Sequence, residues 1–122
     1  MRRPMRKHRQ QPEAAIQKAV VEHLDWRGVP GWQFWSTPNA AKRSLRLGHE
    51  LRLQGMEAGV GDLSLVSPTG RYHELELKTA IGRMSPAQRE RQERLKASGV
   101  ICATAYGLDD ALAKLTAWGA IR

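Results

Sequence analysis

One predicted strand, residues 73–78, constrains the fold of this chain more than any other segment. Side chains alternate along a strand, so Leu75 and Leu77 face one side, while Glu74, Glu76 and Lys78 face the other. A strand between helices has little room for three charges, because burying an unpaired charge costs several kcal/mol. The strand therefore predicts a sheet with one apolar face and one charged face, whose charges need a partner or a bound ion.

A β-hairpin is predicted to end with this strand. Residues 62–66 are predicted as a strand after three glycines, residues 67–70 have the composition of a turn, and the second strand spans 72–78. A turn of four residues makes the numbers of facing residues sum to about 137 to 139. Asp62 is therefore predicted to lie opposite, or nearly opposite, Glu76.

The other predicted elements follow from periodicity and from helix-capping residues. A helix over 12–27 has an apolar stripe, residues 32–37 alternate as a strand, and the basic stretch 40–54 fits a helix better than a partly ordered loop. Ser85-Pro86-Ala87-Gln88 is typical of a capped helix start. The remaining predicted elements are a helix over 86–97, a strand over 100–106 and a closing helix over 108–118. The order α-β-(α)-β-β-α-β-α predicts an α/β domain with a central mixed β-sheet flanked by helices.

Length and charge suggest one domain that binds a polyanion. The 122 residues carry a net charge of +8, and nucleic acid is the partner that this charge favours. We predict a basic disordered tail over 1–11 and a single domain over 12–122. The tail either becomes ordered on a phosphate backbone or only keeps the protein soluble. Its basic residues are Arg2, Arg3, Arg6, Lys7 and Arg9.

Several other classes of protein are not favoured by the composition. No apolar stretch approaches the ~18 residues of a membrane span, and no apolar segment follows the basic start as in a secretory signal. The single Cys102 cannot form an internal disulfide and is predicted to be a buried small apolar residue. His23, His49 and His73 lack the spacing of zinc ligands. We therefore expect a cytoplasmic protein without an organic cofactor.

The paired carboxylates suit a divalent cation. Asp62 and Glu76 offer the hard oxygen ligands that Mg²⁺ accepts, and the backbone carbonyl of Leu77 could add a third. Lys78 lies two residues from Glu76 on the same face, where an ammonium group can stabilise charge developing on a phosphate. These residues predict metal-dependent phosphodiester hydrolysis.

The same residues carry a family resemblance. Gly61-Asp62, then Glu76-Leu77-Lys78, then Ser85-Pro86-Ala87-Gln88 resembles the PD-(D/E)xK nucleases, and specifically the VRR-NUC (virus-type replication-repair nuclease) family. The resemblance extends from Glu13 to Trp118 and implies a restriction-endonuclease-like core. It also implies that Glu13, Asp62, Glu76 and Leu77 bind Mg²⁺ or Mn²⁺, and that Asp62, Glu76, Lys78 and Gln88 are catalytic. One departure is Gly61, where the family commonly has proline.

Some residues have a plainer interpretation beside the catalytic one. Gln88 can be only a capping residue, and Glu13 in a first helical turn can simply complement the helix dipole. Glu74 is either a second acid behind the site or a residue on its rim paired with an arginine, and we favour the rim. Trp32 and Trp35 are expected in the core or an interface rather than stacked on bases.

We therefore predict a DNA endonuclease that recognises structure rather than sequence. The resemblance implies branched, Holliday-junction-like DNA, a homodimer and a phage origin. The alternatives are a non-catalytic DNA-binding accessory protein, or an RNA-directed nuclease or RNA-binding protein. Besides the tail, the predicted phosphate contacts are Lys42, Arg43, Arg46 and Arg52.

Overall fold

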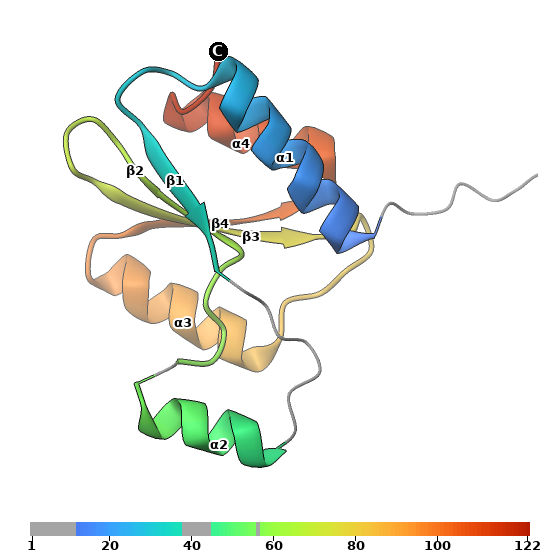
Figure 1. Ribbon diagram of the computed structural model, residues 1–122, viewed down its shortest axis with the longest axis vertical. Coiled ribbons are helices and arrows are strands. Elements are labelled where there is room, and N and C mark those ends of the chain that lie inside the picture. Colours follow the sequence, from blue (N-terminus) through green and yellow to red (C-terminus); the bar gives the residue numbers. More distant parts are fainter. Residues whose placement is uncertain (1–11, 38–44, 56) are drawn as a thin grey trace, which may run out of the picture.

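The computed structural model describes residues 12–37, 45–55 and 57–122 (Figure 1). The elements are α1 (Glu13–Arg27), β1 (Gln33–Ser36), α2 (Leu45–Leu53), β2 (Leu63–Val66), β3 (Tyr72–Lys78), α3 (Pro86–Ala97), β4 (Ile101–Tyr106) and α4 (Leu108–Trp118). This order is the predicted one. The first residues of the predicted 40–54 helix, 40–44, lie outside the described ranges. No helix within these ranges is long and apolar enough to cross a membrane.

The four strands form one mixed sheet in the order β1-β2-β3-β4. The pairs β1–β2 and β2–β3 are antiparallel, whereas β3 and β4 run parallel and are connected through α3. Figure 1 shows α1 and α4 covering one face of the sheet and α3 lying against the other. The α/β fold class with a mixed central sheet is therefore confirmed.

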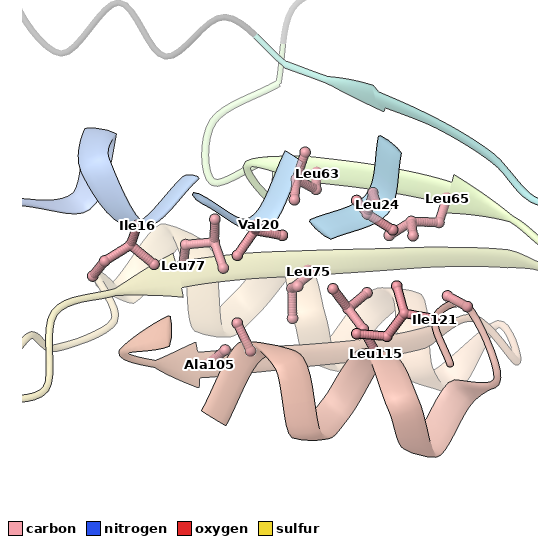
Figure 2. Packing of buried hydrophobic residues seen from close by; sticks show 12 residues of the cluster. Ile16, Val20, Leu24, Leu63, Leu65, Leu75, Leu77, Ala105, Leu115 and Ile121 are labelled. Carbon is pink, nitrogen blue, oxygen red and sulfur yellow. The ribbon is translucent and has the colours of Figure 1, made fainter. Parts of the chain in front are cut away.

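The apolar core lies between the sheet, α1 and α4. Figure 2 shows side chains of α1 pointing toward the leucines of β2 and β3, with those of α4 closing the cluster. Each fully buried side chain of this size stabilises the fold by roughly 1.5–3 kcal/mol. The cluster is formed chiefly by Ile16, Val20, Leu24, Leu63, Leu65, Leu75, Leu77, Ala105, Leu115 and Ile121.

The opposite face of the sheet is polar, as the alternation along β3 predicts. No side chain of α3 is fully buried, and the helix contacts the sheet through polar groups. For example, Gln92 Nε2 donates to Thr104 Oγ1 at 2.8 Å. Stability therefore comes mainly from the side of the sheet that carries α1 and α4, and the α3 side can hold charged groups.

An aromatic cluster closes the end of the core away from the charged groups. The ring of His73 lies between Trp32 and Trp118, with centroid separations of 4.9 and 5.0 Å. Burial lowers the pKa of His73 below its ordinary value. Trp32 packs against the core, as predicted, whereas Trp35 is about half exposed.

Cys102 is buried, as predicted, and burial raises the pKa of its thiol.

Candidate active site

The hairpin register brings Asp62 and Glu76 together. Leu63 pairs with Leu75 and Ser64 with Glu74, so the paired numbers sum to 138. Continuing this register by one residue places Asp62 opposite Glu76. The backbone N–H of Leu77 donates to Asp62 Oδ2 at 2.7 Å, which holds the Asp62 side chain against β3. The prediction that the two carboxylates are neighbours is confirmed.

Glu76 is the acid of the site whose pKa is shifted most from its ordinary value. It is 3% exposed and its carboxylate lies within hydrogen-bonding reach of Asp62. Burial, and then the charge of Asp62, raise the pKa of Glu76 to about 8, although the nearby Lys78 ammonium opposes the shift. Removing the proton from Glu76 leaves two buried negative charges side by side, which requires a compensating positive charge.

The Glu76 oxygen Oε2 is buried and lacks a hydrogen-bond partner among the described residues. Two ionised carboxylates both accept hydrogen bonds, so they cannot bond to each other directly and need a proton, a donor or a cation between them. A divalent cation would satisfy Glu76 Oε2 and neutralise the pair. The residues therefore fit the metal that the sequence predicts.

The remaining donors for such a cation come from the backbone and from water. The N–H and C=O of one strand residue point to the same side of the strand. Because the N–H of Leu77 points to Asp62, its carbonyl faces the same side. The described residues contain no group of three or more Asp, Glu, His or Cys side chains positioned to share a metal ion. The donor set thus consists of two carboxylates, a carbonyl and solvent, which suits Mg²⁺ or Mn²⁺.

Lys78 and Glu13 form the outer edge of the site. Lys78 Nζ lies 3.7 Å from Glu76 Oε1 and 3.9 Å from Glu13 Oε1. The Lys78 side chain is 11% exposed, and that of Glu13 is 45% exposed. Glu13, at the start of α1, therefore contacts the lysine rather than the two buried carboxylates, and its predicted role as a metal ligand remains a prediction.

Gln88 caps α3 and also contacts Glu76, whereas its catalytic role remains a prediction. Its Oε1 accepts from the backbone N–H of Ser85 at 2.8 Å, while its own N–H donates to Ser85 Oγ at 3.1 Å, which completes a capping box at the start of α3. The other end of the amide, Nε2, donates to Glu76 Oε1 at 2.8 Å. The cap therefore orients Gln88 toward the carboxylate pair.

Glu74 differs from the prediction in one respect. It pairs with an arginine, as expected, but it is 3% exposed and so is buried rather than on the rim. Arg91 of α3 donates from Nε and Nη2 to its two oxygens, each at 2.9 Å. Arg91 was not predicted, although it follows Gln88 by three residues and therefore lies on the same helix face.

The predicted phosphate contacts lie mostly outside the described residues. The basic residues of the tail, together with Lys42 and Arg43, fall in the undescribed ranges, and the backbone of Arg46 is in α2 but its side chain is not described. Arg52 is exposed in the last turn of α2. Their role in binding remains a prediction.

Two solved structures share this architecture. A "VRR_NUC domain protein" superposes with a TM-score of 0.73 at 21% identity, covering 90% of this chain and 89% of that one. A second, a "VRR_NUC domain", gives a TM-score of 0.58 at 20% identity, covering 86% of this chain and 94% of that one. The chain has the VRR_NUC fold. The resemblance seen in the sequence is thus confirmed, as is the restriction-endonuclease-like core. No protein-family model matches the chain, and no curated protein does.

The shared fold covers most of this chain. In this chain Asp62 directly precedes β2, Glu76 and Lys78 lie in β3, Gln88 lies in α3, and Glu13 begins α1. The structural likeness concerns the fold alone. The roles of the side chains rest on their geometry in this chain.

Comparing Gln88→Ala with Ser85→Ala should distinguish the cap at Ser85 from the contact of Gln88 with Glu76. We expect Gln88→Ala and Ser85→Ala each to destabilise the fold by about 1 kcal/mol through the loss of the capping box. Only Gln88→Ala frees Glu76, so only this variant should weaken Mn²⁺ binding, by about tenfold. Thermal unfolding and Mn²⁺ titration followed by electron paramagnetic resonance measure the two effects. Equal Mn²⁺ affinity in both variants would limit Gln88 to the cap.

Proposed function

We propose that this protein is a metal-dependent nuclease that hydrolyses phosphodiester bonds in DNA. The observation that carries the proposal is the buried pair Asp62 and Glu76, which lacks a compensating charge at Glu76 Oε2 and lies beside Lys78. The net charge of +8 favours a polyanionic substrate. The names of the two solved structures that share the fold agree with a nuclease.

Each residue of the site has a defined task in this proposal. Asp62, Glu76 and the carbonyl of Leu77 hold Mg²⁺ or Mn²⁺, and Gln88 keeps Glu76 oriented by donating to Oε1. A divalent cation, when bound, supplies positive charge that activates water and offsets charge on the phosphate. Lys78 stabilises the charge that grows on the phosphate oxygens during hydrolysis. Glu13, 3.9 Å from Lys78 Nζ, limits the positions that this ammonium can take.

The substrate is proposed to be branched DNA cut by a homodimer, as the sequence resemblance implies. The sequence contains no recognisable base-reading module, and phosphate contacts alone do not discriminate sequence. Cleavage should therefore depend on the shape of the DNA. Sedimentation of the full chain, alone and on a four-way junction, tests the dimer.

The proposal is tested by cleavage of labelled four-way junction, flap, duplex and single-stranded DNA with Mg²⁺, Mn²⁺ or EDTA. We expect cutting by the wild type in either metal, none in EDTA, and none by Asp62→Asn. Binding without cutting in every metal would instead favour a DNA-binding accessory protein. Matched RNA competitors distinguish an RNA-directed protein.

A further inference from the structure

The carboxylate of Glu74 collects donors from three separate segments. Besides the two bonds from Arg91, Oε1 accepts from the hydroxyl of Tyr72 at 2.7 Å, and the backbone N–H of Gly61 also donates to this carboxylate. Burial opposes ionisation of Glu74, but the bonds from Arg91 and Tyr72 outweigh it and hold its pKa below the ordinary value. The carboxylate of Glu74 is therefore held in place from several directions, and it joins α3 to the residue that precedes Asp62.

Arg91 extends the same connection to the loop before β2. Its Nη1 contacts Glu57 Oε2, so one guanidinium group joins Glu74 in β3 to Glu57 in the loop. Arg94, one turn further along α3, also contacts Glu57 but has no bond to Glu74. The loop from Glu57 to Gly61 is thus attached both to α3 and to the sheet.

The loop packs closely at two glycines, Gly59 against α3 and Gly61 against β3. A Cβ at Gly61 would lie 2.6 Å from Cγ of Glu74 and 3.1 Å from the carbonyl oxygen of Leu75. A Cβ at Gly59 would lie 2.5 Å from the carbonyl oxygen of Ala87. The distances of 2.6 Å at Gly61 and 2.5 Å at Gly59 are shorter than the contacts that real Cβ atoms make. The space that a side chain at position 61 would need is occupied by Glu74 itself, which explains why glycine stands before Asp62 here.

We propose that Glu74 and Arg91 form a positioning clamp, which fixes the Gly61 peptide and so sets the direction in which Asp62 presents its carboxylate to Glu76. Neither residue touches the cation or the substrate. A buried ion pair contributes little net stability compared with apolar residues of similar volume, whereas groups that orient metal ligands strongly affect metal affinity. The consequence for metal binding rests on the proposed function, but the clamp itself does not.

The test compares a charge-free version of the clamp with a matched control. The double variant Glu74→Gln, Arg91→Met keeps the volume of Glu74 and the stem of Arg91, and it leaves no unpaired buried charge. Arg94→Met removes the same type of side chain from the same helix without touching Glu74. Amide hydrogen exchange at residues 61–63, Mn²⁺ affinity and thermal unfolding are measured for each full-length protein.

We expect the double variant to exchange about tenfold faster, or more, at residues 61–63, because a hydrogen bond to a charged group is lost. Its Mn²⁺ affinity should fall about tenfold, while thermal unfolding and exchange in the core strands stay close to wild type. Arg94→Met should leave exchange at residues 61–63 and Mn²⁺ affinity unchanged. Restoring Arg91 in the single variant Glu74→Gln, which keeps an acceptor for the guanidinium group, should recover part of the protection.

Unchanged exchange at 61–63 in a folded double variant would overturn the proposal, as would a uniform rise in exchange across the whole chain. If the double variant does not fold, the single Glu74→Gln variant is judged by the same readouts. A wild-type protein that cuts no DNA or binds no Mn²⁺ would refute the proposed function. The exchange measurement would still decide whether the clamp exists.

Discussion

Replacing Lys78 with methionine is expected to slow DNA cleavage by about 10²–10³-fold, the usual loss when one group that stabilises developing charge is removed. Methionine keeps most of the aliphatic stem, so the packing of this 11% exposed side chain is largely retained. The ammonium 3.7 Å from Glu76 Oε1 is the only group lost. Single-turnover cleavage of the preferred substrate in Mn²⁺, with the protein in excess of the DNA and above the Kd, measures the effect.

The control for Lys78 must remove a positive charge elsewhere. Lys96→Met makes the same substitution at an exposed position of α3. We expect it to cleave like the wild type, and both variants to bind DNA within about threefold of the wild type, because one phosphate contact among many changes affinity little. If Lys78→Met loses binding in proportion to cleavage, Lys78 contacts phosphate without stabilising the transition state.

The sequence predicts the hairpin well because local geometry determines it. A turn of fixed length fixes which residues face each other, and the period of two then assigns each side chain to a face. The sequence alone therefore pairs Asp62 with Glu76. The bounds of α3 follow equally from Ser85 and Pro86 at its start and from Gly99 after its end.

The partners of these side chains are less predictable, because they depend on how α3 packs on the sheet. The alternation of β3 places Glu74 on the charged face but does not show which arginine reaches it, or how deeply it is buried. Gln88 illustrates the same limit, since the capping motif explains Oε1 while only packing shows that Nε2 meets Glu76. One sequence signal could have identified Arg91, namely its three-residue spacing from Gln88 on the helix face.

The two faces of the sheet divide stability and chemistry between them. Apolar burial between the sheet, α1 and α4 stabilises the fold, so the α3 side can hold ionised groups that contribute little stability or even reduce it. The clamp residues and the carboxylate pair both lie on this second side. Substitutions there should accordingly change metal binding and catalysis more than folding, with one exception.

The exception is Glu76, where we expect Glu76→Gln to abolish cleavage and yet stabilise the metal-free protein. The pKa of Glu76 in the folded protein is about 8, compared with an ordinary value of 4.5. Between these values the folded state holds a proton that the unfolded state has released. The stability of the wild type should therefore fall as pH rises through this window, by up to about 1.4 kcal/mol per pH unit. Glutamine cannot ionise, so the variant lacks this loss.

Thermal unfolding in EDTA from pH 5 to pH 9 measures the difference between wild type and Glu76→Gln. The variant should gain relative stability up to pH 8 and hold it above, by a total on the order of a few kcal/mol. Excess Mn²⁺ at pH 8 should stabilise the wild type but not the variant, because only a site with both carboxylates binds the ion tightly. Glu90→Gln, an exposed change on α3, serves as the control and should follow the wild type. A Glu76→Gln protein that is less stable than wild type at pH 9 in EDTA would show that the carboxylate pair is already neutralised by the fold, and the need for a cation at this site would disappear.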